Sequence, residues 1–353
     1  MNIKYLQELL SKIDEIKVIG KNTEVKGVVC NVAALVLYGL QMRLIVLEYD
    51  EKFQEQQEQI EEMKWIEISE LCETPPVPET NRMMMKGSDK NDTFHPFMAV
   101  ENISVGNNEF EVSGAENRKL NIEDVESIIF LSELLRNGWN PEGVDYQNID
   151  MMFLTSIELR GDFAKIPEFE NNPALHFTMG RDTTSYPVER PLVLTVNGEY
   201  SEKIWFNNEE TEEEHWVQIN RVYLSDMWAD VERIYSNPKV FEQMTKEEIF
   251  EIKKNFEKDF IKICPKGMCF PIVEYECEDG ISLEFHTVKY LEATPVHTNG
   301  SIGFMVRPDD ETGILGMKLK AAVIQDPMEP DTEIVEAKLF KYHKTVVLDD
   351  IIM

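Results

Sequence analysis

Residues 270–286 read FPIVEYECEDGISLEFH, and this stretch predicts two short β-strands joined by a tight turn. A three-residue loop with Gly280 in the left-handed conformation places Tyr275 opposite Leu283 and gathers the apolar side chains of both strands on one face. A two-residue loop would shift the register and place Tyr275 opposite Glu284. We therefore predict the three-residue loop and an antiparallel hairpin.

The rest of residues 245–353 extends this β pattern. Thr245, followed three residues later by Glu248, has the form of a capping box and starts a predicted helix over 246–262. Short apolar runs separated by turn residues follow, and they predict an antiparallel sheet or sandwich. These runs lie near residues 301–307, 314–324, 333–343 and 345–348.

Composition divides the preceding chain into three segments. Residues 1–72 are predicted to form a small α/β module that opens with an amphipathic helix over 3–16. Residues 73–92 combine three prolines with a run of methionines and fit neither helical nor strand periodicity, so we expect a linker. Residues 93–244 show a mixed α+β pattern. The predicted fold class is therefore α+β, with several domains and a β-rich C-terminal region.

Several elements of the middle segment have clear signals. The spacing of apolar residues predicts a helix over 122–135 that ends at Asn137-Gly138. Strands are predicted over 151–159, 191–196 and 215–223. The turn after 191–196 leads towards 204–206, and we interpret these two runs as a hairpin.

Residues 28–47 are long and apolar enough to cross a bilayer, but two features favour another interpretation. Arg43 is costly at the membrane centre, and Gly39 with many β-branched neighbours suits buried strands or a buried helix. We expect no membrane association. The chain has five cysteines and no signal peptide at its start, which predicts free thiols in a reducing compartment and a cytoplasmic location.

The formal net charge of −31 limits the classes of partner. Such a field repels phosphate, so we expect no nucleic-acid binding, whereas a protein with a basic surface would be attracted. Trp205 and Trp216 flank the acidic run 209–214 and are candidate binding residues. A non-catalytic protein-binding module is therefore the first functional hypothesis, and a carbohydrate- or ligand-binding β domain is an alternative.

A second alternative is a hydrolase-type enzyme with its site in the middle segment. Nucleophilic catalysis needs a hydroxyl or thiol beside a base, and the base needs an orienting acid. Residues of these types gather there without forming a recognised motif, so the hypothesis requires that they meet in one pocket. The candidates are His176, Arg181, Asp182, Ser185 and His215.

The predicted hairpin register also places Glu274 opposite Glu284, with His286 nearby. Two close carboxylates can share a proton or a divalent cation, although on an acidic sheet they are also typical of a solvated face. A zinc site built from His286 with Cys264, Cys269 and Cys277 has suitable ligand types. The register directs Cys277 and His286 to opposite faces, so we predict buried structural thiols and neither a metal nor a cofactor.

Overall fold

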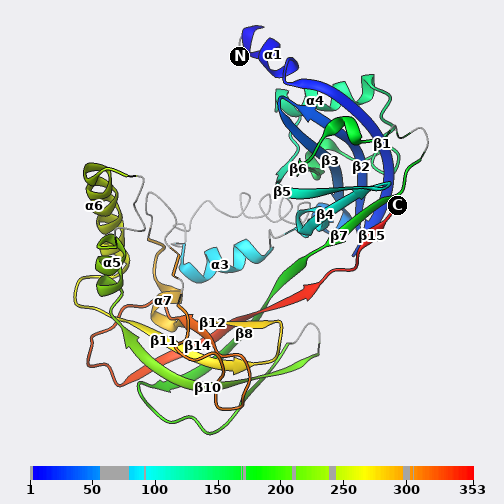
Figure 1. Cartoon of the computed structure of the whole chain (residues 1–353). Helices are drawn as coiled ribbons and strands as arrows, with labels where there is room; N and C mark the ends of the chain where they lie inside the picture. The colour runs from blue at the N-terminus through cyan, green and yellow to red at the C-terminus, as the bar shows by residue number, and fades with distance from the viewer. Residues whose placement is uncertain are drawn as a thin grey trace, which may run out of the picture. The chain divides into compact units, whose positions relative to one another are not determined.

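The computed structural model describes residues 3–55, 79–90, 93–167, 169, 172–208, 212–237, 244–296, 303–304 and 306–353. The chain is β-rich α+β, with more residues in strands than in helices and with large antiparallel sheets (Figure 1). It packs as two compact units. The N-terminal unit comprises Met1–Pro75, Asp92–Asp182 and Val346–Met353, and the sandwich unit comprises Pro76–Asn91 and Thr183–Thr345.

These boundaries differ from the predicted segments because strands that are distant in sequence pair with one another. The C-terminal strand β15 (Ile351–Ile352) pairs with β7 (Leu175–Met179), which returns the end of the chain to the N-terminal unit. Helix α3 (Asn81–Lys90) occupies much of the predicted linker, whose residues 73–78 and 91–92 lie outside the described part. Composition carries no information on such long-range pairing.

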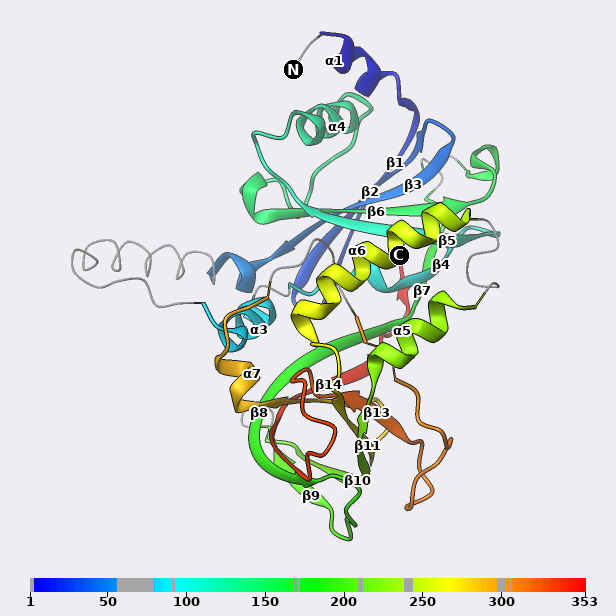
Figure 2. The same cartoon turned by 90° about the vertical axis from the view of Figure 1, so that its left-hand side faces the viewer.

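The N-terminal unit is built on one eight-stranded antiparallel sheet in the order β1-β2-β3-β6-β5-β4-β7-β15 (Figure 2). Short turns join β1 to β2, β2 to β3 and β4 to β5, whereas the connection from β5 to its partner β6 is long and contains helix α4 (Val125–Arg136). The strands not yet given are β1 (Ile13–Val25), β2 (Val28–Tyr38), β3 (Gln41–Asp50), β4 (Val100–Val105), β5 (Asn108–Lys119) and β6 (Met152–Arg160).

The apolar stretch 28–47 forms a hairpin of buried strands, which confirms the first of the two expected alternatives, buried strands or a buried helix. Strands β2 and β3 pair along this stretch, and Gly39 forms the turn with a φ of +63°. No helix in the described part of the chain is long and apolar enough to cross a membrane. The helix expected over 3–16 is shorter: α1 (Ile3–Leu10) ends early because the residues from Ile13 onward pair with β2.

Both faces of this sheet are covered by apolar contacts. One core includes Leu44, Ile103 and Phe177, and it draws on seven of the strands, with β1 packing against it through Ile19 and Val25. On the other face, helix α4 (Val125–Arg136) packs over the sheet through buried side chains (Figure 2). The predicted helix and its stop are confirmed, since Gly138 follows its end at a φ of +86°, but the helix begins at Val125 and not at Ile122, because Asp124 supplies the cap.

Two further sheets pack face to face in the sandwich unit, with their apolar side chains in a common core. Their strand orders are β13-β11-β10-β9 and β12-β14-β8. Helices α5 and α6 cover the outer face of the four-stranded sheet. The strands are β8 (Arg181–Thr195), β9 (Ile204–Asn207), β10 (Glu214–Ser225), β11 (Phe270–Cys277), β12 (Ile281–Thr287), β13 (Lys320–Val323) and β14 (Ile334–Val347), and the helices are α5 (Met227–Tyr235), α6 (Lys246–Ile263) and α7 (Val288–Glu292).

The predicted hairpin at 270–286 is wrong in its pairing. Gly280 adopts the expected left-handed conformation, with a φ of +74°, but β11 pairs with β10 and β13 whereas β12 pairs with β14. The two strands therefore belong to opposite sheets and face each other across the core, where Leu283 N donates to the Tyr275 hydroxyl oxygen at 2.8 Å. Alternation does not predict which strand supplies the partner, and it also placed Glu274 on a solvated face although every residue of β11 is buried.

One other strand pairing and the length of one strand also differ from expectation. Strand β9 pairs with β10, not with the preceding strand β8. The strand expected over 314–324 is reduced to β13, because the backbone amides of Leu315 and Met317 turn to donate to the Glu276 carboxylate. The capping box at Thr245 and Glu248 is confirmed, and α6 begins at the predicted residue.

The turn at Gly280, which joins β11 of one sheet to β12 of the other, can be tested by substitution. A Cβ at Gly280 would lie 2.7 Å from the carbonyl oxygen of Thr345, whereas a Cβ at Gly267, also left-handed, would meet nothing within 4 Å. We expect G280A to lower the free energy of unfolding by about 2 kcal/mol more than G267A, because overpacking adds to a similar backbone strain. Urea unfolding measures this difference, and equal losses in the two variants would contradict the described turn.

Candidate functional site

The candidate hydrolase residues are divided between the two units. His176 and Asp182 belong to the N-terminal unit. His176 Nε2 lies 3.0 Å from an Asp350 carboxylate oxygen, and Asp182 forms an ion pair of 3.0 Å with Lys26. Neighbouring Arg181 is exposed. These residues therefore pair with groups outside the predicted set.

Ser185 and His215 belong to the sandwich unit and also have separate partners. His215 Nδ1 lies 2.8 Å from an oxygen of Glu278, and the imidazole is almost fully buried. Ser185 Oγ lies 2.8 Å from Nδ1 of His343, a residue that the sequence analysis did not select. The serine and this second histidine are 158 residues apart in the chain, so spacing gave no signal for the pair.

The predicted carboxylate pair is separated because its two strands lie in different sheets. Arg221 of β10 donates two hydrogen bonds of 3.0 Å to Glu274, which is buried. Glu284 instead pairs with His286, whose Nε2 lies 2.6 Å from an oxygen of the Glu284 carboxylate. Of the proposed group, the structure therefore joins only Glu284 and His286.

Two of the cysteines considered as zinc ligands, Cys264 and Cys277, lie in different apolar clusters. Cys264 packs beneath α5 and α6, and burial raises the pKa of its thiol to about 11. Cys277 lies in the sandwich core, where Lys320 Nζ is 3.2 Å from its sulfur. Among the described residues, no group of three or more His, Cys, Asp or Glu side chains has an arrangement that would hold a metal ion.

Glu284 lies at the centre of a hydrogen-bonded chain on the three-stranded sheet. One carboxylate oxygen faces His286, and the other lies 3.4 Å from Nε2 of His343. Burial alone would raise the pKa of Glu284, but the hydrogen bonds from both histidines outweigh it and lower that pKa to about 2. The carboxylate is therefore ionised at neutral pH.

A second ionic group anchors helix α3 within the same unit. Glu189 of β8 pairs with Arg82 and Lys86 of α3 and, at 3.2 Å, with Lys338 of β14. Burial opposes the charge of Glu189, but hydrogen bonds from these three cations lower the pKa of its carboxyl to about 2. This group ties the helix to the strands.

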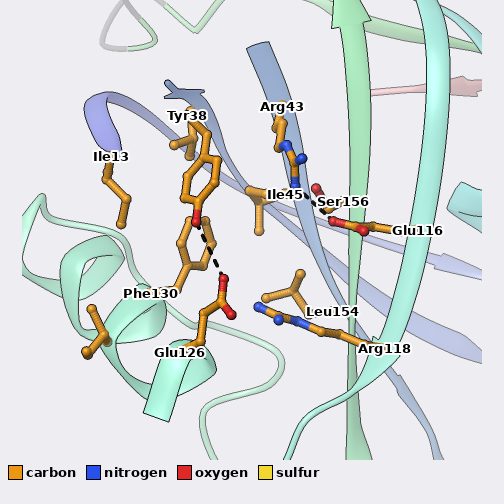
Figure 3. A pocket seen from close by; sticks show the side chains of 12 residues that line it. Ile13, Tyr38, Arg43, Ile45, Glu116, Arg118, Glu126, Phe130, Leu154 and Ser156 are labelled. Carbon is orange, nitrogen blue, oxygen red and sulfur yellow. Dashed lines mark hydrogen bonds and ion pairs between the residues drawn. The ribbon is translucent and has the colours of Figure 1, made fainter. Parts of the chain in front are cut away.

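A polar hollow lies in the N-terminal unit between α4 and the sheet (Figure 3). Its apolar walls come from α4 and from the outward side chains of β2, β3 and β6. Its volume is about 70 Å³, and since a water needs about 10–15 Å³, there is room for several waters or for a ligand of about five non-hydrogen atoms. Its polar lining residues are Tyr38, Arg43, Glu116, Arg118, Glu126 and Ser156.

The charged groups of this pocket differ in how firmly they are engaged. Arg43 donates to Glu116 at 2.8 Å, yet its Nε is buried and has no hydrogen-bond partner among the described residues. The ion pair between Arg118 and Asp124 is long, at 3.9 Å, and Glu126 accepts a hydrogen bond from the Tyr38 hydroxyl at the long distance of 3.4 Å. One cation and one carboxylate therefore face the pocket with weak partners.

Tyr38 reflects this environment. Burial raises the pKa of its phenol, and the neighbouring Glu126 carboxylate raises it further. The hydroxyl is therefore protonated at neutral pH and serves as a donor to the pocket. Of these residues, the sequence analysis singled out only Arg43, as the cation within an apolar run; the others become recognisable only when β5 and α4 bring them together.

A second hollow lies on the other side of α4. It is lined mainly by apolar side chains of the helix, of the sheet and of the segment after the helix, including Leu131, Trp139 and Met152. Its volume is about 350 Å³. Helix α4 is thus flanked by unfilled space on two sides, although Phe130 and Leu134 anchor it firmly to the sheet.

Comparison with known proteins gives no family assignment. No protein-family model matches this chain, and neither a curated protein nor a solved structure is significantly similar to it. The functional argument therefore depends on the geometry of the described residues.

The pKa of Glu284 leads to a stability prediction. Because this pKa is lower in the folded chain than the usual 4.5, the carboxylate stabilises the fold above about pH 4.5, and this contribution is lost as the pH falls towards 2. We expect E284Q to lower the free energy of unfolding at neutral pH by up to about 3 kcal/mol. The loss should shrink progressively in acid.

Urea unfolding at a series of pH values measures this difference. E111Q is the control, because Glu111 is 67% exposed and its ion pair with Arg160 is 3.7 Å long, so its removal should change stability by less than about 1 kcal/mol. A loss in E284Q that does not vary between neutral pH and about pH 3 would contradict the assigned ionic contribution.

Proposed function

We propose that the N-terminal unit is a ligand-binding module whose pocket under α4 takes a small molecule carrying both a carboxylate and an ammonium group. The observation that carries this proposal is the pair of weakly engaged opposite charges, Arg118 and Glu126, on the walls of one hollow (Figure 3). A zwitterion would satisfy both groups at once, whereas a simple anion would meet the repulsion of Glu126.

The other polar groups of the pocket fit the same ligand. The unpartnered Arg43 Nε supplies a donor for a carboxylate oxygen. The pocket volume of about 70 Å³ matches an amino acid of about five non-hydrogen atoms, such as glycine. Apolar side chains such as Ile45 and Leu154 complete the walls and reduce the competition from water.

Isothermal titration calorimetry with glycine, acetate and methylamine tests this function. We expect glycine to bind more tightly than either single-charge probe, because only glycine engages both Arg118 and Glu126. R118Q and E126Q should each weaken glycine binding about tenfold, which corresponds to about 1.4 kcal/mol.

The matched control is R160Q, which removes an arginine of the same sheet from outside the pocket lining. This variant should bind glycine like the unmodified chain. Equal heats for the three probes, or unchanged glycine binding in both R118Q and E126Q, would overturn the proposal.

A second candidate function is binding of a basic protein segment at the edge of the four-stranded sheet. Strand β9 forms this edge, and its Trp205 is 46% exposed beside its register partner Trp216. Glu214, which lies opposite Asn207 at the end of β9, adds negative charge to this edge; it ends the acidic run 209–214, of which 209–211 lie outside the described residues. An extended basic segment would be attracted to this charge and to the open backbone groups of the strand.

A lysine-rich peptide of ten residues is a suitable probe of this edge. We expect W205A to weaken peptide binding at least tenfold in fluorescence anisotropy, and we expect added salt to weaken binding to the unmodified chain. V193A is the control, since Val193 is 69% exposed on a strand of the other sheet. Equal affinities of W205A and V193A would exclude Trp205 from the binding surface.

A further inference from the structure

The outer face of the three-stranded sheet holds a serine, two histidines and a glutamate in one connected chain. Ser185 lies on β8, His343 on the central strand β14, and Glu284 and His286 on β12. The contacts run from Ser185 Oγ to His343 Nδ1 at 2.8 Å, from His343 Nε2 to Glu284 at 3.4 Å, and from Glu284 to His286 Nε2 at 2.6 Å.

The protonation of these four hydrogen-bonded side chains follows from the carboxylate that accepts their hydrogen bonds. An ionised carboxylate only accepts hydrogen bonds, so the nitrogens that face Glu284 carry the protons. His343 Nε2 is therefore a donor, and in the neutral imidazole His343 Nδ1 is left with a lone pair. That lone pair faces Ser185 Oγ, which places the serine hydroxyl as a donor to a base.

His286 fixes the position of the carboxylate. Its side chain is 2% exposed, stacks on Tyr290 with ring centres 5.0 Å apart, and meets Phe340 edge-on. These contacts hold the imidazole in place, and its short contact with one oxygen of Glu284 leaves the other oxygen facing His343. His286 is thus a positioning residue within this arrangement.

The reactive end of the chain is open to solvent. The side chain of His343 is 29% exposed, and Ser185 is partly exposed. Both residues of the serine–histidine pair are therefore in contact with solvent. A serine beside a base that is itself oriented by a carboxylate is the arrangement that activates serine nucleophiles.

We propose that Ser185 is a nucleophile towards small carboxylic esters, with His343 as its base and Glu284 as the group that orients and stabilises the histidine. Ser185 Oγ forms a bond to the ester carbonyl carbon while its proton passes to His343 Nδ1. The ester carbon–oxygen bond then breaks, and the proton passes from His343 to the departing alkoxide. Water, deprotonated by His343, subsequently cleaves the acyl-serine, releases the carboxylic acid and restores the serine hydroxyl.

The probe is p-nitrophenyl acetate on the full chain, read by release of p-nitrophenolate and by mass spectrometry of the peptide that contains Ser185. We expect acetylation of this peptide in the unmodified chain and its loss in S185A. H343A should acetylate at least about 100-fold more slowly, and added imidazole should restore part of the rate, because general-base assistance contributes about 10²–10⁴-fold. A purely structural histidine would show no such rescue.

The matched control is T183A, because Thr183 Oγ1 pairs with Thr345 Oγ1 at 2.9 Å between the same two strands without a histidine. This variant should retain acetylation of Ser185. If S185A does not fold, S185C keeps the test decisive, since its thiol should take the acetyl group in place of the hydroxyl. Acetylation confined to lysines, or an unchanged rate of Ser185 acetylation in H343A, would overturn the proposal.

Discussion

A carboxylate taken out of water loses hydration worth several kcal/mol, and only well-placed donors replace it. This chain, with its net charge of −31, nevertheless buries several acidic side chains within its sheets. Each is held in a different way. Glu48 lies 2.8 Å from a ring nitrogen of His95, and Glu274 accepts two hydrogen bonds from the Arg221 guanidinium. Glu276 accepts hydrogen bonds from backbone amides, and Asp326 accepts one from the Thr287 hydroxyl at 2.6 Å.

These donors connect segments that apolar packing alone would leave loosely related. The amides that reach Glu276 fix the loop before β13, and a Cβ at Gly313 in that loop would collide with the Glu276 carboxylate. Lys86 and Arg82 attach α3 to β8 through Glu189. Part of the negative charge therefore lies inside the packed structure and not only on its surface, and each buried carboxylate needs a hydrogen-bond donor beside it.

The pocket under α4 departs from this rule, and the departure has functional significance. Glu48, Glu274, Glu276 and Asp326 have close donors, whereas Glu126 and Arg118 have only distant partners on the walls of a hollow. Partly buried charges with incomplete partners are costly unless something else completes them. A small zwitterionic ligand is the simplest group that would do so for both charges.

Local signals in the sequence were sufficient for much of the secondary structure. The capping box at Thr245, the stop after the helix ending at Arg136 and the left-handed Gly280 were all predictable, since each depends on residues a few positions apart. The partners of the strands were not predictable, because β11 and β12 satisfy the same alternation whether they pair directly or face each other across a core. The apparent pair of Glu274 and Glu284 was a consequence of that error.

The candidate sites were less accessible to sequence reasoning for the same reason. Ser185 was selected by residue type, and Glu284 and His286 were selected from a hairpin register that proved wrong. His343, which joins Ser185 to Glu284, lies on a strand whose place in the sheet order no local pattern reveals. Arg118 and Glu126 are eight residues apart in sequence, yet a strand and a helix carry them to the same hollow. Long-range topology creates these groupings.

The most direct measurement is a crystal structure of the full chain grown with glycine. We expect density for one glycine in the pocket, with its carboxylate on Arg118 and its ammonium group on Glu126, and with both side chains close to their positions here (Figure 3). A pocket that holds only water, with Arg118 and Glu126 joined directly in an ion pair, would show that the N-terminal unit does not bind this zwitterion.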